Sequence, residues 1–124
     1  MRTAAQRTGD AAEARAAAHM EALGWHVLAT HVRVGRAELD LVAVDPGRPP
    51  QLVIVEVRWR SRRDFGLPEE TVDAGKRARL HRAGLALREL GCFPSGQRLP
   101  ALPMRFDLIV IEPAGRLRHY RHGA

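Results

Sequence analysis

Two short stretches of the sequence carry acidic and basic side chains at the spacing of a β-strand. Glu38 and Asp40 are two residues apart, and so are Glu56 and Arg58. Side chains two apart on a strand point to the same face of the sheet. If the two stretches are neighbouring strands, three carboxylates and a guanidinium converge on one patch.

Such a patch suits metal-assisted chemistry on phosphates. Carboxylate oxygens favour Mg²⁺ or Mn²⁺, which prefer hard ligands and retain waters. The metal can polarise a phosphoryl oxygen and lower the pKa of an attacking water, while a cationic side chain stabilises developing negative charge. The alternative is that the charged face is merely solvated, which is the commonest reason for strands that alternate apolar and charged residues.

The segments around these pairs have the pattern of a β-meander. Apolar residues alternate over residues 37–44, and valines alternate with other residues over 51–60. A short β-branched strand is expected before them, over residues 25–33, and turn residues separate the three strands. The valine-rich third strand is typical of a central strand that is covered on both faces.

Helical periodicity before and after the meander predicts helices that cover the sheet. Apolar residues recur at helical spacing over residues 10–23, and a second apolar stripe contains Val72, Leu80, Ala83, Leu87 and Leu90. The remaining segments are expected to form a loop, a connection, a fourth strand and a short edge strand, over residues 61–68, 92–103, 104–111 and 116–121 in that order. The order α-β-β-β-α-β favours an α/β fold with a mixed sheet flanked by helices.

Composition limits the class of protein. The 124 residues suit a single domain over residues 1–124, and 45% hydrophobic with 27% charged residues excludes a disordered chain. Lys+Arg 20 against Asp+Glu 14 gives a net charge of +6, so polyanions are the expected partners. No apolar run approaches the roughly 20 residues that span a bilayer, so a membrane protein is not expected. The single cysteine, Cys92, favours a reducing cytoplasm.

Basic residues gather on the third strand and in the loop and helix that follow it. The predicted cluster comprises Arg58, Arg60, Arg62, Arg63, Lys76, Arg77, Arg79 and Arg82. It is typical of a surface that contacts the phosphate backbone of DNA, and the alternative is a solvated face of an arginine-rich protein. Because aromatic residues make up only 5% of the chain, platforms that stack unpaired bases are not evident, and duplex or branched DNA is the expected substrate.

Two residues on the predicted helices could complete the patch. Lys76 is the only lysine and lies on the apolar stripe of the second helix, where it is expected to face the sheet, the alternative being a stem that extends to solvent. Glu13 flanks the stripe of the first helix and could reach the carboxylates. Alternatively, Asp10 and Glu13 have the spacing of a helix capping arrangement.

These residues together resemble the UPF0102 (YraN-like) family. The resemblance covers nearly the whole chain and rests on residues 35–42, 53–58, 65–66 and 105–110, with Gly9, Glu13, Ala14 and Lys76. It implies a restriction-endonuclease-like fold, whose core has the α-β-β-β-α-β order. It also implies a PD-(D/E)xK metal site similar to Asp40, Glu56 and Arg58, with Glu13 as the acid on the first helix.

The chain departs from the family and nuclease patterns at three positions. Leu39 stands where the nuclease pattern has proline, and Ala37 stands where the family usually has glycine. Arg58 occupies the position of the nuclease lysine, and a guanidinium clamps phosphate but does not transfer protons. Lys76 could substitute for that lysine, as relocated lysines do in relatives of this nuclease fold.

The leading hypothesis is therefore a divalent-metal-dependent nuclease acting on DNA, including branched DNA such as a four-way (Holliday) junction. Asp40, Glu56 and Glu13 would be the metal ligands, Glu38 an auxiliary acid, and Arg58 and Lys76 the catalytic cations. The alternative is a catalytically inactive nucleic-acid-binding module with the same fold. Two-fold symmetric cleavage would require a homodimer, for which the sequence shows no interface.

Three further residues, outside the predicted acidic patch, have other expected roles. For Asp107, near the start of the fourth strand, the resemblance implies a structural partner for an arginine such as Arg105, the alternative being a distant acid near the site. His119 and His122 are three residues apart, so a strand would direct them to opposite faces and a zinc pair is not expected. Both histidines are expected at the surface.

Overall fold

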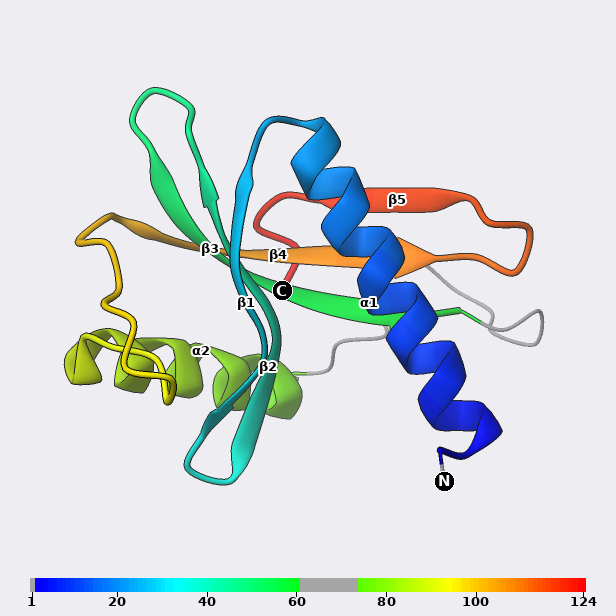
Figure 1. The fold of residues 1–124 in the computed structure, drawn as a ribbon, viewed down its shortest axis with the longest axis horizontal. Helices are drawn as coiled ribbons and strands as arrows, with labels where there is room; N and C mark the ends of the chain where they lie inside the picture. Colours follow the sequence, from blue (N-terminus) through cyan, green and yellow to red (C-terminus); the bar gives the residue numbers. More distant parts are fainter. Residues whose placement is uncertain (1, 61–73) are drawn as a thin grey trace.

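The fold is a mixed five-stranded sheet with α1 against one face and α2 against the other (Figure 1). The computed structural model describes residues 2–60 and 74–124. In chain order the elements are α1 (Ala4–Ala22), β1 (His26–Val34), β2 (Ala37–Asp45), β3 (Gln51–Trp59), α2 (Ala74–Leu90), β4 (Met104–Ile111) and β5 (Leu117–Tyr120). The predicted α/β fold with the order α-β-β-β-α-β is confirmed. The predicted loop over residues 61–68 lies outside the described residues.

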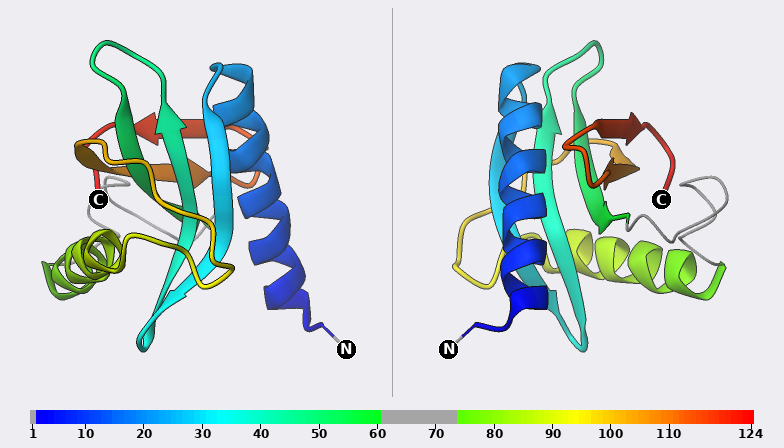
Figure 2. Two further views of the ribbon diagram at one scale, coloured as in Figure 1. Left: turned by 60° about the vertical axis from the view of Figure 1, so that its left-hand side comes forward. Right: turned by 90° about the vertical axis from the view of Figure 1, so that its right-hand side faces the viewer.

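The strands lie in the sheet in the same order as in the chain. β1, β2 and β3 form the predicted antiparallel meander, and β5 pairs antiparallel with β4 at the far edge. β3 and β4 are parallel, so the chain must cross from one end of the sheet to the other between them, and α2 lies on that crossover. Figure 2 shows the two helices on opposite sides of the twisted sheet.

Each helix packs an apolar stripe against its own face of the sheet. Beneath α1, the helix residues Ala12, Ala16 and Met20 meet Leu41, Ala43, Val53, Val55 and Ile109. Beneath α2, Leu80, Ala83 and Leu87 meet Leu39, Val42, Leu52, Ile54, Leu108 and Val110. β3 and β4 contribute to both layers, which is why their sequences are almost continuously apolar. Neither helix of the described residues is long and apolar enough to cross a bilayer.

α1 begins six residues earlier than predicted, at Ala4. Thr3 caps the helix, because its hydroxyl accepts from the Gln6 amide at 3.1 Å and the Gln6 side chain accepts from the Thr3 amide at 2.7 Å. Asp10 and Glu13 therefore lie inside the helix, and the capping arrangement suggested for them is wrong. The predicted end is confirmed by Gly24, whose φ of +85° favours glycine.

The apolar stripe of α2 is confirmed at three positions and wrong at a fourth. Leu80, Ala83 and Leu87 are buried, whereas Leu90 is 66% exposed. Leu90 is the last residue of the helix, three residues beyond Leu87, the last residue of α2 that is buried. Val72 falls outside the described residues.

A buried ion-pair network holds the start of β4. Arg105 donates to both carboxylate oxygens of Asp107 at 2.9 Å each, and to Asp45 at 2.9 Å and Gln51 at 2.7 Å. The prediction that Asp107 is the partner of Arg105 is confirmed. His119 is not a surface residue as predicted, because its Nε2 lies 2.8 Å from the buried carboxylate of Asp107. These contacts lower the pKa of Asp107, although burial alone would raise it.

Gly84 sets how closely α2 approaches β4. A Cβ at this position would lie 2.7 Å from the ring of Phe106, which is itself stacked on His81. We expect Gly84→Ala to lower the free energy of unfolding, since overpacking of about 1–3 kcal/mol exceeds the roughly 1 kcal/mol gained in helix propensity. Gly9→Ala in α1 is the control, because nothing lies within 4 Å of its Cβ, and it should stabilise. Urea unfolding measures both, and equal shifts would contradict the close contact.

Candidate functional site

β2 and β3 pair over only half of their lengths and then separate. Their pairing runs from Asp45 opposite Gln51 to Leu41 opposite Val55 and ends there. Beyond that point β2 continues beside β1 and β3 continues beside β4, so the strands diverge as Figure 1 shows. We call this opening the fork. The first side chains past the last pair are those of Asp40 and Glu56.

The carboxylate of Asp40 makes a hydrogen bond across the fork. Its Oδ2 accepts from the backbone amide of Val57 at 2.9 Å. A buried backbone amide needs an acceptor, and here a side chain supplies it where the ladder between β2 and β3 has ended. Asp40 is therefore fixed beside β3, close to Glu56.

The strict alternation that places Glu38 and Asp40 on one face is interrupted at the fork. Leu39 packs in the α2 layer and Leu41 in the α1 layer, so two residues of the same parity lie on opposite faces. Glu38 instead contacts His31, with Oε1 3.2 Å from Nδ1, and is 44% exposed. The prediction of three converging carboxylates thus holds directly for Asp40 and Glu56, while Glu38 lies at the periphery.

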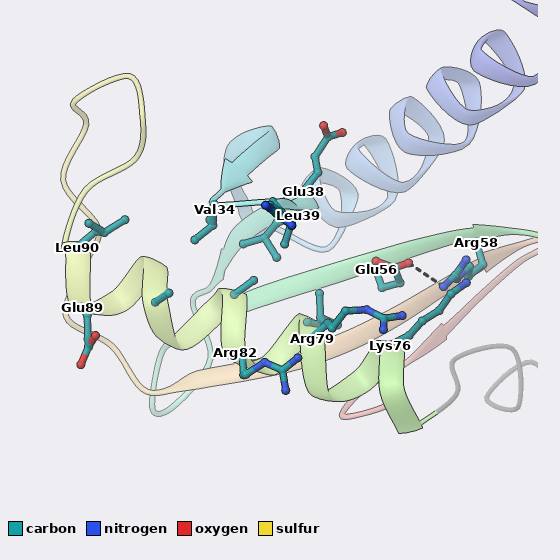
Figure 3. A pocket seen from close by; sticks show the side chains of 16 residues that line it. Val34, Glu38, Leu39, Glu56, Arg58, Lys76, Arg79, Arg82, Glu89 and Leu90 are labelled. Carbon is teal, nitrogen blue, oxygen red and sulfur yellow. Dashed lines mark ion pairs between the residues drawn. The ribbon is translucent and has the colours of Figure 1, made fainter.

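Glu56 and Arg58 share a face as predicted. Arg58 Nη2 lies 3.2 Å from Glu56 Oε1, and the two side chains are 27% and 18% exposed. Both line the same groove beside α2. In Figure 3 the dashed line joins them, and the side chain of Lys76 extends from the first turn of α2 toward the pair.

Burial and mutual repulsion make the acidic pair hard to ionise. Burial raises the pKa of Glu56 from its ordinary value of 4.5 to about 7, and the nearby charge of Asp40 adds to this rise. Arg58 and Lys76 oppose it. Burial also raises the pKa of Asp40, although the hydrogen bond from Val57 acts in the other direction. Two neighbouring carboxyl groups with raised pKa values are stabilised when they bind a proton or a cation.

Glu13 approaches the pair from α1. Burial raises the pKa of Glu13 to about 6, and the largest additional contribution is the charge of Asp40. Glu13 forms an ion pair with His31 of β1, whose φ of +51° is unusual for a residue other than glycine. Ligand atoms of Asp10, Glu13 and His31 all lie within 4.8 Å of one another. The structure thus brings the predicted helix acid to the α1 side of the fork.

His31 is the functional candidate that the sequence analysis missed. It contacts both Glu13 and Glu38, so it joins the two peripheral acids. In the register between β1 and β2 it falls opposite Asp40, between the pairs Thr30–Leu41 and Val32–Leu39. Nothing in the spacing of the sequence signals this contact, because it depends on the irregular backbone at His31.

A groove of about 1080 Å³ separates α2 from the hairpin of β1 and β2. Its lining includes Val34, Arg36, Glu38, Leu39, Glu56, Arg58, Lys76, Arg79, Leu80, Arg82, Ala83, Ala86, Glu89 and Leu90. Figure 3 places Glu56 and Arg58 at one end and Val34 and Leu90 at the other. The side chain of Lys76 is exposed, not covered by the sheet as expected, but it extends toward the pair of Glu56 and Arg58.

The predicted basic cluster divides between the groove and other surfaces. Arg58, Lys76, Arg79 and Arg82 line the groove, whereas the exposed Arg77 does not. Arg60 follows the end of β3 and is half-buried. Arg62 and Arg63 lie outside the described residues. Arg36, in the turn of the hairpin, lines the groove and was not part of the prediction.

The oxygen donors at the fork are those that a hard divalent cation takes. Asp40 and Glu56 are near each other and partly buried, and the charges of Arg58 and Lys76 offset only part of the effect of burial on the pKa of Glu56. Carboxylates in this arrangement could hold Mg²⁺ or Mn²⁺ with open positions for water. The cations of Arg58 and Lys76 lie on the groove side, where a phosphate would approach.

Comparison with known proteins gives one consistent family. The sequence model of the uncharacterised protein family UPF0102 matches residues 12–111. The chain is 42% identical over 116 residues to a UPF0102 protein of Symbiobacterium thermophilum, which covers 91% of this chain and 90% of the relative. It is 38% identical over 104 residues to a UPF0102 protein of Deinococcus radiodurans, with coverage of 84% and 79%. It is also 38% identical over 120 residues to one of Xanthomonas campestris pv. campestris, with coverage of 97% and 92%.

The raised pKa of Glu56 predicts how stability depends on pH without metal. Between 4.5, the ordinary value, and about 7 the folded state binds more protons than the unfolded chain, so stability falls as pH rises through this window. Because Glu56→Gln removes the titrating carboxyl group, we expect the variant to lack the part of this fall in stability that Glu56 causes. Urea unfolding in EDTA at about pH 5 and about pH 8 should therefore show a difference of a few kcal/mol between wild type and variant only at the higher pH.

Glu21→Gln provides the matched control for this measurement. Glu21 is exposed on α1, away from the fork. Its variant should follow the wild-type pH dependence. If Glu56→Gln also followed it, the acidic pair would not be the origin of the fall.

Proposed function

This chain belongs to the uncharacterised protein family UPF0102, and we propose that it is a divalent-metal-dependent nuclease that cleaves DNA at the fork between β2 and β3. The observation that carries the proposal is the partly buried acidic pair of Asp40 and Glu56, with the cations of Arg58 and Lys76 beside it. On a solvated strand face, both carboxylates would lie in water and have ordinary pKa values. Here both carboxylates are partly buried and the pKa of each is raised.

The donors at the fork fit Mg²⁺ or Mn²⁺. Asp40 and Glu56 would hold the cation, and Glu13, whose pKa the charge of Asp40 raises, would complete the site from α1. When bound, such a cation supplies Lewis acidity toward a phosphate oxygen and a bound water of lowered pKa. Glu38 would act indirectly as an auxiliary acid, since its contacts are to His31 and Arg33.

Arg58 and Lys76 would have different tasks. Arg58 is always charged and is anchored to Glu56, so it would orient a non-bridging oxygen of the scissile phosphate and stabilise the charge that develops there. Lys76 extends from α2 toward the same place and carries a compact ammonium charge at the end of a four-carbon stem. It would supply the lysine that β3 lacks.

Charge supports DNA as the substrate. The chain carries a net charge of +6, and several arginines line the groove that leads to the fork. Contacts of this kind are made to phosphates, so binding should weaken steeply as salt rises and should depend little on sequence. Duplex DNA and branched DNA, including four-way junctions, remain the candidate substrates.

The second candidate is a DNA-binding module of the same fold without activity. The observation that favours it is Arg58, which holds the position of the nuclease lysine and cannot transfer a proton. The two candidates differ in metal binding, since an inactive module has no need of it. Calorimetric titration of the purified protein with Mn²⁺ separates the two candidates. The double variant Asp40→Asn/Glu56→Gln, which lacks both carboxylates, is the negative control.

Loss of Glu56 should abolish cleavage while leaving DNA binding. We expect Glu56→Gln to reduce metal-dependent cleavage of a labelled four-way junction or duplex by at least about 100-fold, because the metal loses a charged ligand and its hydrogen-bonded surroundings. A gel assay in Mn²⁺ and in EDTA measures this, with Glu21→Gln as the matched control. Undiminished cleavage by Glu56→Gln would overturn the assignment, and absence of cleavage by wild type would favour the inactive module.

Lys76 should matter more for cleavage than its neighbour Arg77. Both side chains are exposed near the start of α2, but only Lys76 lines the groove and extends toward the pair of Glu56 and Arg58. We expect Lys76→Ala to lower kcat by about 10- to 100-fold and Arg77→Ala to leave kcat within about twofold. Single-turnover cleavage measures the difference. If the two variants lost activity equally, Lys76 would contribute only general attraction for DNA.

A further inference from the structure

The nuclease proposal uses only one end of the groove. Glu56, Arg58 and Lys76 lie at that end, and the groove then continues between α2 and the hairpin as far as Val34 and Leu90. We propose that this continuation binds an unpaired strand of nucleic acid and directs it to the fork. The inference rests on the proposed function and specifies its substrate class: a DNA with a single-stranded segment at the cleavage point.

The groove combines an apolar floor with a cationic rim. The floor consists of the exposed Ala86 and Leu90 and the partly buried Val34 and Ala37, together with the core residues Leu39, Leu80 and Ala83, which are at most 9% exposed. Five cationic side chains, those of Arg36, Arg58, Lys76, Arg79 and Arg82, outnumber the three acidic ones of Glu38, Glu56 and Glu89. The groove therefore offers positive charge beside apolar contact, the latter mainly from Ala86 and Leu90.

These two properties suit an unpaired strand better than a duplex. A duplex keeps the faces of its bases inside the stack and presents phosphates outward, so an apolar floor gives it nothing to contact. An unpaired strand exposes base faces and phosphates together, so it can place base faces on an apolar surface while its phosphates contact cationic side chains. Leu90 is 66% exposed although it lies in the groove, so it is an apolar surface that a base could cover.

The cationic side chains of the groove stand on both of its walls. Arg36 stands on the hairpin wall, and Arg79 and Arg82 stand on α2, which forms the facing wall. In Figure 3 the guanidinium of Arg79 is directed toward the end that holds Glu56. A strand whose phosphates contact these arginines would have its next phosphate near Arg58 and Glu56, where the acidic pair lies.

The floor is aliphatic, which sets the character of the binding. Aromatic residues are only 5% of the chain, and none lines the groove among the described residues. Aliphatic side chains offer base faces apolar contact but none of the stacking that aromatic rings provide, so they should discriminate little between bases. We expect weak sequence preference and an affinity that falls with salt.

The test is binding in EDTA, where no cleavage occurs. Fluorescence anisotropy compares a labelled oligothymidylate with a blunt duplex of equal length, at equal salt. We expect the single strand to bind at least about tenfold more tightly. Equal or tighter binding of the duplex would overturn the inference.

Two neighbouring positions on α2 provide the matched variants. Ala86 and Leu85 are both exposed, but only Ala86 lines the groove. Ala86→Glu places a carboxylate on the floor and should weaken single-strand binding by about tenfold, while Leu85→Glu should change it by less than about twofold. Leu90→Glu is a second groove variant, and circular dichroism confirms that each variant is folded. Equal weakening by Ala86→Glu and Leu85→Glu would show that charge alone, and not the groove, accounts for binding.

The outcomes for this inference and for the nuclease proposal are separable. Single-strand binding that Ala86→Glu abolishes, in a protein that cleaves nothing in Mn²⁺, would support the groove and reject the nuclease. Metal-dependent cleavage of continuous duplex that Ala86→Glu leaves unchanged would support the nuclease and reject the groove. Cleavage confined to substrates with an unpaired segment, and lost in Ala86→Glu, would support both.

Discussion

The candidate site depends on the point where β2 stops pairing with β3. Had the ladder continued past Leu41 and Val55, Asp40 and Glu56 would face each other across paired strands with no space between them for a ligand. The divergence opens that space, and it leaves the amide of Val57 in need of an acceptor. Asp40 provides one at 2.9 Å, so one carboxylate both closes the end of the ladder and forms half of the acidic pair.

The surrounding core makes this local arrangement tolerable. Val55 and Val57, on either side of Glu56, pack with the α1 layer, which directs Glu56 to the opposite face, beside α2. Burial there is what raises its pKa to about 7, and the adjacent Asp40 increases the effect. The folded chain thus holds two acids that would be more stable apart, and the apolar layers on both faces of the sheet keep them together.

The sequence predicts the elements well because their signals are local. Alternating valines identify β3, and the spacing of Glu56 and Arg58 predicts their shared face. The failures arise where the backbone is irregular or the partner is distant. Alternation places Glu38 beside Asp40, but Glu38 is 44% exposed and contacts His31, and His119 is partly buried beside Asp107 of β4. Neither event leaves a mark in residue spacing, since each depends on contacts across the sheet.

Different side chains of α2 pack against the core and line the groove. Leu80, Ala83 and Leu87 anchor the helix and are fixed by the core, whereas Arg79, Arg82 and Ala86 line the groove and are exposed. Surface substitutions usually change stability by less than about 0.5 kcal/mol, so the second set is free to vary while the first is not. Over evolutionary time this helix can therefore be retuned toward new ligands without a loss of folding, and divergence within the family should concentrate on its groove-facing residues.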